Sequence, residues 1–280
     1  MIANTQANSR VVLALGAHPD DVEISCAGTL QALSDLGYSI HIATMTLGDC
    51  GSKELPAEQV RQCRRGEAED ACRILRATHH YVGSNDFSIF NDDIHNRLAT
   101  ALLREVAPAI VFTHSPGDYI LDHDNTSVLA RNACFYAPAN NYDCSQFTSS
   151  PALTAIPHLY YWDVMEGVDI FGKPVVPEFY VNITDGVELK TQMLAAHRSQ
   201  GKWLRDQHGI GEYVNSMRAW GARRGEEAES LNRQEEGADS SKSSPVMYAE
   251  AFRQHLGHAY PRDNILKSVL QGRVVVNPSY

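Results

Sequence analysis

Histidine and aspartate side chains follow an apolar run near the start of the chain. The run VVLALGA ends directly before His18, Pro19, Asp20 and Asp21. Imidazole and carboxylate groups are ligands for Zn²⁺ and other divalent first-row metals. His18 and Asp21 lie three residues apart in a turn that Pro19 restrains, so both can face one point. Asp20 then points elsewhere and is free to act as a base.

A third metal ligand should come from another part of the chain, because a catalytic metal needs about three protein ligands and an open position. The segment AIVFTHSPGDYILDHDNT has the pattern of a strand, a loop and the start of a helix. Its two histidines, His114 and His123, both qualify as the third ligand. In open parallel sheets, ligands bind beyond the carboxyl ends of the strands, which is where these segments would meet.

The elements that position these residues alternate along the first half of the chain. Apolar, β-branched runs predict strands at 11–17, 39–47, 79–83 and 109–114, and helical spacing predicts helices at 22–36, 57–75, 94–106 and 125–136. Further strands are expected at 158–165 and 178–184, with a helix at 185–198. The alternation predicts an α/β fold that is Rossmann-like, with a mostly parallel sheet and helices on both faces.

The domain organisation follows from the absence of a linker. We expect one domain over residues 1–280. The segment 221–245, GARRGEEAESLNRQEEGADSSKSSP, is charged, rich in serine and poor in apolar residues, which predicts a flexible loop or a lid over a site. An ordered pattern resumes at VMYAEAFRQHL, residues 246–256.

Composition excludes several classes of partner. The chain has 280 residues and a formal net charge of −10, which argues against binding to nucleic acid or to an anionic membrane. No apolar run reaches the roughly 18 residues of a membrane helix, and MIANTQANSR has no secretory core. The six cysteines show no paired spacing, so we expect reduced thiols and a cytoplasmic protein. We expect a small-molecule substrate and leave a homo-oligomer open.

The motifs together resemble one enzyme family. AHPDDVE resembles the signature of the PIG-L/LmbE family of zinc-dependent deacetylases, and LDH, ending at His123, resembles its distal metal motif. TLGDCG resembles the family's second loop, RRGEAEDACRIL its arginine–glutamate helix, and SNDFSI the segment with a substrate-contacting aspartate. The resemblance covers roughly residues 11–200 and implies removal of acetyl groups from N-acetylglucosamine units.

The resemblance assigns a role to each matching residue. It implies metal binding by His18, Asp21 and His123, and it makes Asp20 the general base. It also implies that Arg64 and Asp86 hold sugar hydroxyls or a substituent on the sugar. The metal would be Zn²⁺, although a site of two histidines and one aspartate also accepts Fe²⁺ or another divalent ion.

The sequence departs from the family at Ile120. Many members have a histidine there, which polarises the carbonyl or stabilises the oxyanion, and an isoleucine cannot do this. We expect another donor to replace it, and the candidates are His114, Tyr119, His255 and His258. The Tyr119 hydroxyl can donate, whereas an ionised Asp118 could only orient a histidine or fix the loop. Loss of one such donor typically costs about 100- to 1000-fold in rate.

The function that these residues favour is metal-dependent hydrolysis of an N-acetyl group on an amino sugar, with release of acetate. An amidase acting on another small amide, such as a thiol conjugate, would use the same metal scheme. A non-catalytic sugar-binding or scaffold protein is the alternative from a different class, and Ile120 keeps it open. A nucleotide-binding protein is disfavoured because GAHPDD lacks the glycine-rich turn that binds a pyrophosphate.

Overall fold

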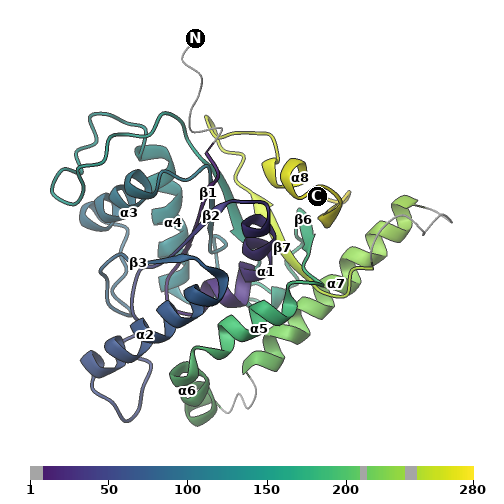
Figure 1. Cartoon of the computed structure of the whole chain (residues 1–280), viewed down its shortest axis with the longest axis horizontal. Coiled ribbons are helices and arrows are strands. Elements are labelled where there is room, and N and C mark those ends of the chain that lie inside the picture. Colours follow the sequence, from purple (N-terminus) through teal and green to yellow (C-terminus); the bar gives the residue numbers. More distant parts are fainter. Residues whose placement is uncertain (1–8, 209–212, 237–244) are drawn as a thin grey trace.

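A single eight-stranded sheet runs through the protein. The structure is a computed structural model that describes residues 9–208, 213–236 and 245–280 (Figure 1). The strand order across the sheet is β3-β2-β1-β4-β5-β7-β6-β8. The strands are β1 (Val11–Gly16), β2 (Ser39–Thr44), β3 (Thr78–Tyr81), β4 (Ile110–Thr113), β5 (His158–Trp162), β6 (Phe179–Asn182), β7 (Ala249–Gln254) and β8 (Val274–Val276).

The sheet has a parallel part and an antiparallel part. The five strands from β3 to β5 in the sheet order all pair in parallel, which confirms the predicted mostly parallel sheet. β7 comes late in the sequence but lies between β5 and β6, and it is antiparallel to both. β8 pairs antiparallel with β6 and forms the edge. The carboxyl ends of the parallel strands therefore lie at the same edge as the amino end of β7.

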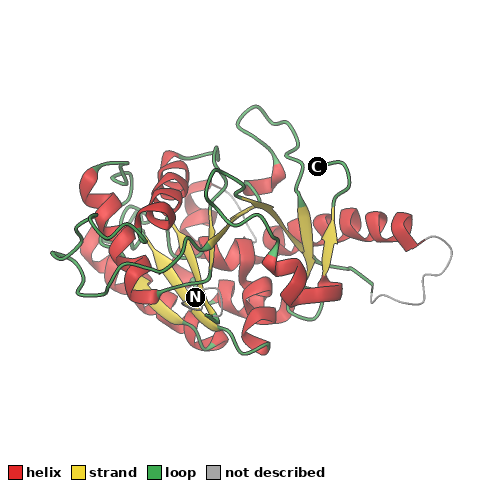
Figure 2. Cartoon of the chain, turned by 90° about the horizontal axis from the view of Figure 1, so that it is seen from above, coloured by secondary structure: helices red, strands yellow, loops and turns green. Residues whose placement is uncertain are grey.

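Helices cover both faces of the sheet (Figure 2). Along β1, Val12 and Ala14 contribute to the core on one face, whereas Leu13 and Leu15 contribute to the core on the other. This alternation is what a strand buried on both faces requires. The helices are α1 (Asp21–Asp35), α2 (Ala57–Leu75), α3 (Asp93–Val106), α4 (Leu121–Tyr136), α5 (Val187–Ala195), α6 (Arg198–His208), α7 (Tyr213–Glu236) and α8 (Ile265–Leu270).

The segment predicted as a flexible loop at 221–245 is largely helical. Residues 221–236 belong to α7, the long helix at the lower right of Figure 1, so the prediction of a loop is wrong there. Residues 237–244 lie outside the described residues. The face that α7 turns to the protein includes Met217, Arg224 and Ala228, all buried. These residues have helical spacing. Because one of them is an arginine and another is a small alanine, the hydrophobic pattern was too weak to predict the helix from the sequence.

Two contacts explain why the inner face of α7 carries such residues. Gly225 lies so close to the strand segment before β7 that a Cβ there would be 2.4 Å from the Met247 carbonyl oxygen. Arg224 is neutralised by Asp163, with an Nη2–Oδ2 distance of 2.7 Å, and by Glu227. A small residue and a paired charge thus replace the apolar side chains that usually identify a buried helix face.

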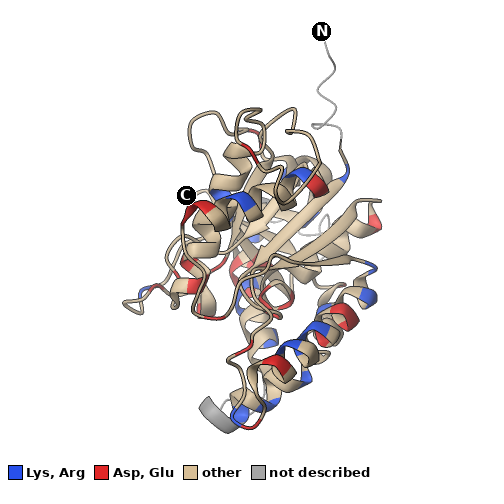
Figure 3. Cartoon of the chain, turned by 90° about the vertical axis from the view of Figure 1, so that its left-hand side faces the viewer, with Lys and Arg blue, Asp and Glu red and all other residues tan. Residues whose placement is uncertain are grey.

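The other helices and strands that the sequence predicts are present with shifted boundaries. α4 begins at Leu121 rather than at residue 125, and the predicted helix 185–198 is α5, followed by α6. β8 and α8 were not predicted. Acidic and basic residues are interspersed along the outer helices in Figure 3. Within the described part of the chain, no helix is long and apolar enough to span a membrane.

Candidate metal-dependent active site

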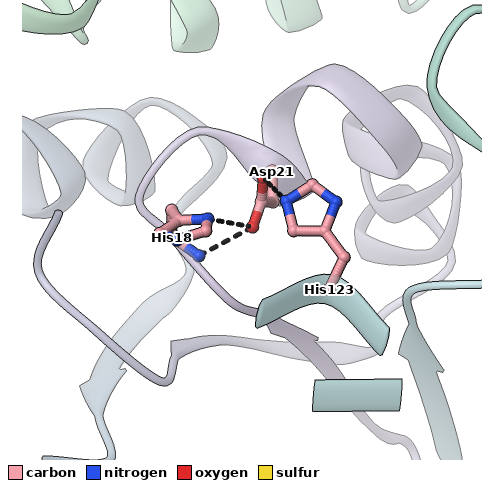
Figure 4. Close-up of side chains that lie close together, drawn as sticks. All are labelled: His18, Asp21 and His123. Carbon is pink, nitrogen blue, oxygen red and sulfur yellow. Dashed lines mark hydrogen bonds and ion pairs between the residues drawn. The ribbon is translucent and has the colours of Figure 1, made fainter. Parts of the chain in front are cut away.

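The candidate site lies at the carboxyl ends of β1 and β4. His18 lies two residues beyond β1, Asp21 is the first residue of α1, and His123 lies in the first turn of α4. Figure 4 shows the two imidazoles on either side of the Asp21 carboxylate. Residues more than 100 positions apart therefore meet because neighbouring parallel strands end at the same edge.

The distances among the three side chains suit a metal ion. His18 Nδ1 is 3.6 Å from Asp21 Oδ2, and His123 Nε2 is 3.3 Å from Asp21 Oδ1. Atoms that bind one Zn²⁺ tetrahedrally at about 2.0–2.1 Å lie about 3.3 Å from one another. The three ligand atoms all lie within 4.8 Å of one another. No metal ion is part of this structure, so the fit depends on these protein atoms.

Two further aspartates orient the two imidazoles. His18 Nε2 lies 3.1 Å from Asp122 Oδ2, and His123 Nδ1 lies 3.0 Å from Asp118 Oδ2. A carboxylate accepts a hydrogen bond, so each of these ring nitrogens carries the hydrogen. When the rings are neutral, the opposite nitrogens, which face Asp21, have a lone pair that can bind a metal ion. Such carboxylate–histidine pairs are typical of metal sites.

The buried Nε2 atom of His123 supports the assignment directly. His123 is 1% exposed, and within the described part of the chain its Nε2 atom makes no hydrogen bond and has only the 3.3 Å contact with Asp21 Oδ1. A buried polar atom without a hydrogen-bond partner is costly unless a bound ion or water satisfies it. A divalent cation between His123, Asp21 and His18 would do so, and the donor set is the one that such ions accept.

The electrostatics of the cluster favour positive charge. Burial disfavours a charged His18, but the hydrogen bonds to Asp122 and Asp21 outweigh it and raise the pKa of His18 to about 10. Burial likewise opposes a charged His123, but Asp21 and Asp118 raise its pKa to about 9. The surrounding carboxylates therefore create a site that attracts cations.

Asp20, the predicted base, is held in a strained backbone conformation. Its φ angle is 103°, in the left-handed region that non-glycine residues rarely adopt. Tyr213, the first residue of α7, donates its hydroxyl hydrogen to Asp20 Oδ2. Arg64 Nη2 lies 3.5 Å from Asp20 Oδ1. Burial raises the pKa of Asp20, and the Arg64 charge opposes that rise. Strain of this kind persists at functional sites when the surroundings enforce it.

Arg64 is buried and contacts Asp20, whereas a charged residue on a helix is usually exposed to solvent. It is 2% exposed, and its guanidinium donates to the carbonyl oxygens of Pro19, at 2.7 Å, and Gly48, at 3.3 Å. Gly48 has a φ of 69°, and a Cβ at this position would lie 1.9 Å from Arg64 Nη1. The loop after β2 therefore needs glycine to make room for Arg64. The predicted contact between Arg64 and a sugar stays a prediction.

Asp86, the second predicted substrate contact, joins the loop after β3 to the loop after β2. Its Oδ1 accepts from the Thr46 hydroxyl at 2.7 Å, and its Oδ2 accepts from the Cys50 N–H at 2.9 Å. It also lies 3.9 Å from His18 Nε2. The residue therefore borders the metal cluster, as expected. Its contact with a substrate remains a prediction.

His114 is buried and contacts two of the candidate metal ligands, Asp21 and His123. It is 1% exposed, and its Nε2 atom lies 3.0 Å from the Ala17 backbone nitrogen and 3.1 Å from Asp21 Oδ2. Its ring stacks on that of His123 at a centroid distance of 3.9 Å. The Nε2 atom cannot both accept from Ala17 and donate to Asp21, so the tautomer decides which of the two contacts is a hydrogen bond. His114 as a donor to the oxyanion stays a prediction.

Tyr119 lies at the mouth of the site. Its ring meets the His123 ring edge-on at a centroid distance of 5.1 Å, and its side chain is 64% exposed. Burial of the hydroxyl and the nearby Asp21 and Asp20 carboxylates raise the pKa of Tyr119. The hydroxyl therefore keeps its hydrogen at neutral pH. Ile120, where the family's histidine is missing, directly precedes α4.

The C-terminal histidines lie elsewhere. β7 is antiparallel to β5, so its carboxyl end lies at the opposite edge of the sheet from the metal cluster. His255 follows β7 and pairs its N–H with the Leu159 carbonyl near the start of β5. His258 lies three residues further on and is exposed. The prediction that His258 or His255 supplies the missing donor is therefore wrong, because it ignored the direction of β7.

The sequence did not predict a role in the site for Tyr213 or for Asp122. Tyr213 contacts Asp20 across 193 positions, and nothing in its local sequence indicates this. The link between Asp122 and His18 had a usable signal, since Asp122 directly precedes the predicted ligand His123 at a helix start. The orienting role of Asp118 was considered, and the structure confirms that its carboxylate contacts His123.

A small cavity adjoins the cluster on its inner side. Its volume is about 60 Å³, and its lining includes Asp21, His123, Trp162, Met217 and Trp220. One water needs roughly 10–15 Å³ on this measure. The cavity therefore has room for a few non-hydrogen atoms next to the ligands, between β5 and α7.

Comparisons with known proteins agree with the geometry. The family model PIG-L, described as GlcNAc-PI de-N-acetylase, matches residues 13–134. The uncharacterized deacetylase YaiS of Escherichia coli K12 is 30% identical over 146 residues, which cover 48% of this chain and 74% of that protein. The chain belongs to the PIG-L family. All three candidate metal ligands lie inside the matched segment.

Other proteins that resemble this chain in sequence or in fold differ in what their names say they act on. The diacetylchitobiose deacetylase of Thermococcus kodakarensis is 24% identical over 203 residues, covering 68% of this chain and 69% of that protein. The structure of GalB, the 4-carboxy-2-hydroxymuconate hydratase of Pseudomonas putida KT2440, matches with a TM-score of 0.70 and 21% identity, covering 91% of this chain and 98% of GalB. The shared fold alone therefore does not fix the reaction.

Proposed function

We propose that this PIG-L protein is a metal-dependent hydrolase that removes the N-acetyl group from an amino sugar of the N-acetylglucosamine type and releases acetate. The observation that carries the proposal is the pairing of two oriented imidazoles with Asp21, next to the strained carboxylate Asp20. The description of the family and the name of the Thermococcus relative support the choice of an N-acetylated amino sugar.

The metal would be held by His18, Asp21 and His123. Zn²⁺ fits this donor set, and Fe²⁺ or another divalent ion is also acceptable to it. A cation bound there would supply Lewis acidity toward water and toward the amide carbonyl. Asp118 and Asp122 keep the two imidazoles in the tautomers that binding requires.

Asp20 acts first as the general base and then as the general acid in this scheme. Among the residues that the structure describes, its Oδ1 atom has only the 3.5 Å contact with Arg64, so it can accept a hydrogen from water as the water attacks the amide. The protonated carboxyl can then deliver that hydrogen to the leaving amine. Tyr213 fixes the other oxygen of Asp20, and this restricts rotation of the carboxylate.

Tyr119 is the donor that we assign to the developing oxyanion. Its ring lies 5.1 Å from that of His123, and its hydroxyl carries a hydrogen at neutral pH. It would replace the histidine that many members have at the position of Ile120. The cavity of about 60 Å³ beside Asp21 and His123 has room for a few non-hydrogen atoms, which suits a short acyl group such as acetyl.

A screen for acetate release tests the proposed reaction. Metal-loaded protein is incubated with N-acetylglucosamine, diacetylchitobiose and N-acetylglucosaminyl conjugates, with N-acetylated thiol compounds as the arm for another small amide. We expect acetate from at least one amino sugar and none from metal-stripped protein. Acetate from the thiol compounds alone would favour the amidase, and none from any compound in the loaded protein would contradict the proposal.

Variants of Asp20 and Tyr213 separate their roles. Asp20→Asn should keep the metal and lose about 100- to 10,000-fold in turnover, because an amide cannot accept the water's hydrogen. Tyr213→Phe should cause a smaller loss at unchanged metal content. Asp35→Asn, on the exposed end of α1, is the matched control and should leave turnover unchanged. A cytoplasmic location and a homo-oligomer stay predictions.

A further inference from the structure

A strained turn beside the metal cluster carries an exposed aromatic ring. Residues 85–88 form a turn closed by the Ser88 N–H and the Asn85 carbonyl oxygen at 3.1 Å. Phe87, its third residue, has a φ of 60°. A positive φ at this position of a turn favours glycine or asparagine, and a bulky side chain there is a backbone outlier. The chain thus keeps a phenylalanine where its own turn favours another residue.

The ring of Phe87 is not packed in the core, so burial of the ring does not offset the free-energy cost of this backbone strain. The side chain is 65% exposed. A large apolar side chain in a strained conformation and in contact with solvent contributes little to folding. A role in binding accounts for both the exposure and the strain.

The backbone of Phe87 is tied to the metal cluster. Its N–H donates to Asp122 Oδ2 at 2.8 Å, and the same oxygen lies 3.1 Å from His18 Nε2. The carboxylate that orients a metal ligand therefore also fixes the turn. Tyr119 borders the other imidazole, and its ring is 64% exposed. The backbone of Phe87 thus adjoins the carboxylate that contacts His18, and the ring of Tyr119 adjoins His123.

A hydrogen-bond acceptor accompanies the ring. Asp86 precedes Phe87 in the turn, and each of its carboxylate oxygens accepts one hydrogen bond, from Thr46 and from Cys50. A carboxylate offers about four lone-pair positions, so acceptor capacity remains for a hydroxyl donor. A pyranose ring presents C–H groups on its faces and hydroxyls at its edges. An aromatic face next to a carboxylate suits both.

We propose that Phe87 is a specificity-determining residue that stacks against the pyranose ring of the amine part of the substrate, with Tyr119 as the opposite wall and Asp86 as the acceptor at its edge. This rests on the proposed function, since it places the sugar on the exposed side of the metal cluster and the acyl group in the inner cavity. The strain at Phe87 is then the cost of presenting the ring.

Substitutions at Phe87 test the proposal through binding and stability together. Phe87→Asn removes the ring and suits the turn, because asparagine tolerates a positive φ. Phe87→Trp keeps an aromatic face. Phe90→Ala is the matched control, since Phe90 is an aromatic residue of the same segment and is 55% exposed. Binding of N-acetylglucosamine and glucosamine to metal-loaded protein is measured by calorimetry or NMR titration, and the melting temperature is measured in parallel.

We expect Phe87→Asn to bind both sugars at least 10-fold more weakly and to melt a few degrees higher than the parent. Phe87→Trp should bind within about 3-fold of the parent, and Phe90→Ala within about 2-fold. Unchanged binding in Phe87→Asn, or the absence of sugar binding in the parent, would overturn the inference. A merely structural role for Phe87 would lower the melting temperature of Phe87→Asn instead.

The outcomes also separate this inference from the proposed function. If the parent releases acetate from amino sugars and Phe87→Asn does so with unchanged KM, the proposed function stands and the subsite is wrong. If the parent releases no acetate but its binding of sugars depends on the Phe87 ring, the subsite stands and the proposed reaction is wrong.

Discussion

Two clusters of histidines in this protein have opposite electrostatic properties. The site histidines, His18 and His123, have a raised pKa despite their burial. The strand histidines, His41, His79 and His80 on β2 and β3, have a lowered pKa. For His80 the causes are burial and the neighbouring His41 and His79, and its pKa falls to about 4. Both clusters bring imidazoles close together, so proximity of histidines is not the difference.

The difference lies in the carboxylates. Asp21, Asp118 and Asp122 each lie within 3.3 Å of a nitrogen of one of the site histidines. The strand histidines contact one another instead: His41 Nδ1 and His80 Nε2 are 2.9 Å apart, and Ser39 supplies a hydroxyl. One of the two facing nitrogens must carry the hydrogen and the other the lone pair. Imidazoles thus indicate a cation site only when acids accompany them.

The largest effect is expected when a site histidine is removed. His123→Ala should reduce bound metal from about one ion per chain to nearly none, because it deletes one of about three protein ligands. His80→Ala, in the other cluster, should keep the full metal content. Metal analysis of both purified variants checks this. Full metal content in His123→Ala, or loss of metal in His80→Ala, would contradict the conclusion that only the site histidines bind the metal.

Removing the orienting carboxylates should have an intermediate effect. Asp118→Asn and Asp122→Asn keep the shape of the side chain but lose the charge that fixes the tautomer of His123 or His18. We expect metal affinity to fall about 10- to 100-fold in each variant. Competition with a chelator of known affinity measures this. An unchanged affinity in both variants would mean that the carboxylates only shape the loop.

Adding a carboxylate to the strand histidines should reverse their behaviour in part. Ser39 Oγ lies 3.3 Å from His41 Nε2, so Ser39→Asp puts an acid beside that ring. The pKa of His41, which burial lowers in the parent, should rise. An NMR titration of the His41 ring compares Ser39→Asp with Ser39→Asn. Equal titration curves would show that burial alone governs this cluster.

The smallest expected effect is on the pH dependence of folding. His80 has a pKa of about 4 in the folded protein and about 6.5 when unfolded, so the unfolded chain binds more protons between these values. Its contribution to stability is therefore full above about pH 6.5 and falls as the pH drops toward 4. His80→Gln should flatten the free energy of unfolding over this window. Denaturant melts at pH 7 and pH 4.5 measure it, and equal slopes in both proteins would contradict the assignment.

The first half of the fold could be read from the sequence because its strands are continuous apolar runs. β1 and β4 are buried on both faces, which leaves a strong local signal. α7 could not be read in this way, because its inner face relies on Gly225 for close approach and on Arg224 for ion pairs. Both residues are typical of exposed or irregular segments unless the partner is known.

The residues of the candidate site also fall into a group that the sequence predicted and a group that it did not. His18, Asp21 and His123 were predictable because the ends of parallel strands converge and because their motifs are specific. His258 was misplaced because the direction of β7 depends on long-range pairing, which local pattern does not encode. The contact between Tyr213 and Asp20 depends on the placement of α7, so it was out of reach as well.

The position of β7 has a consequence for the order in which the chain can fold. β7 ends at Gln254, yet it lies between β5 and β6 in the sheet. During synthesis, β6 therefore cannot join the sheet until about 70 further residues have emerged, whereas β1 to β5 can pair as they appear. The three metal ligands belong to this early part, and Tyr213 belongs to the late part. A nascent chain can thus gain its ligands well before the Tyr213 hydroxyl reaches Asp20.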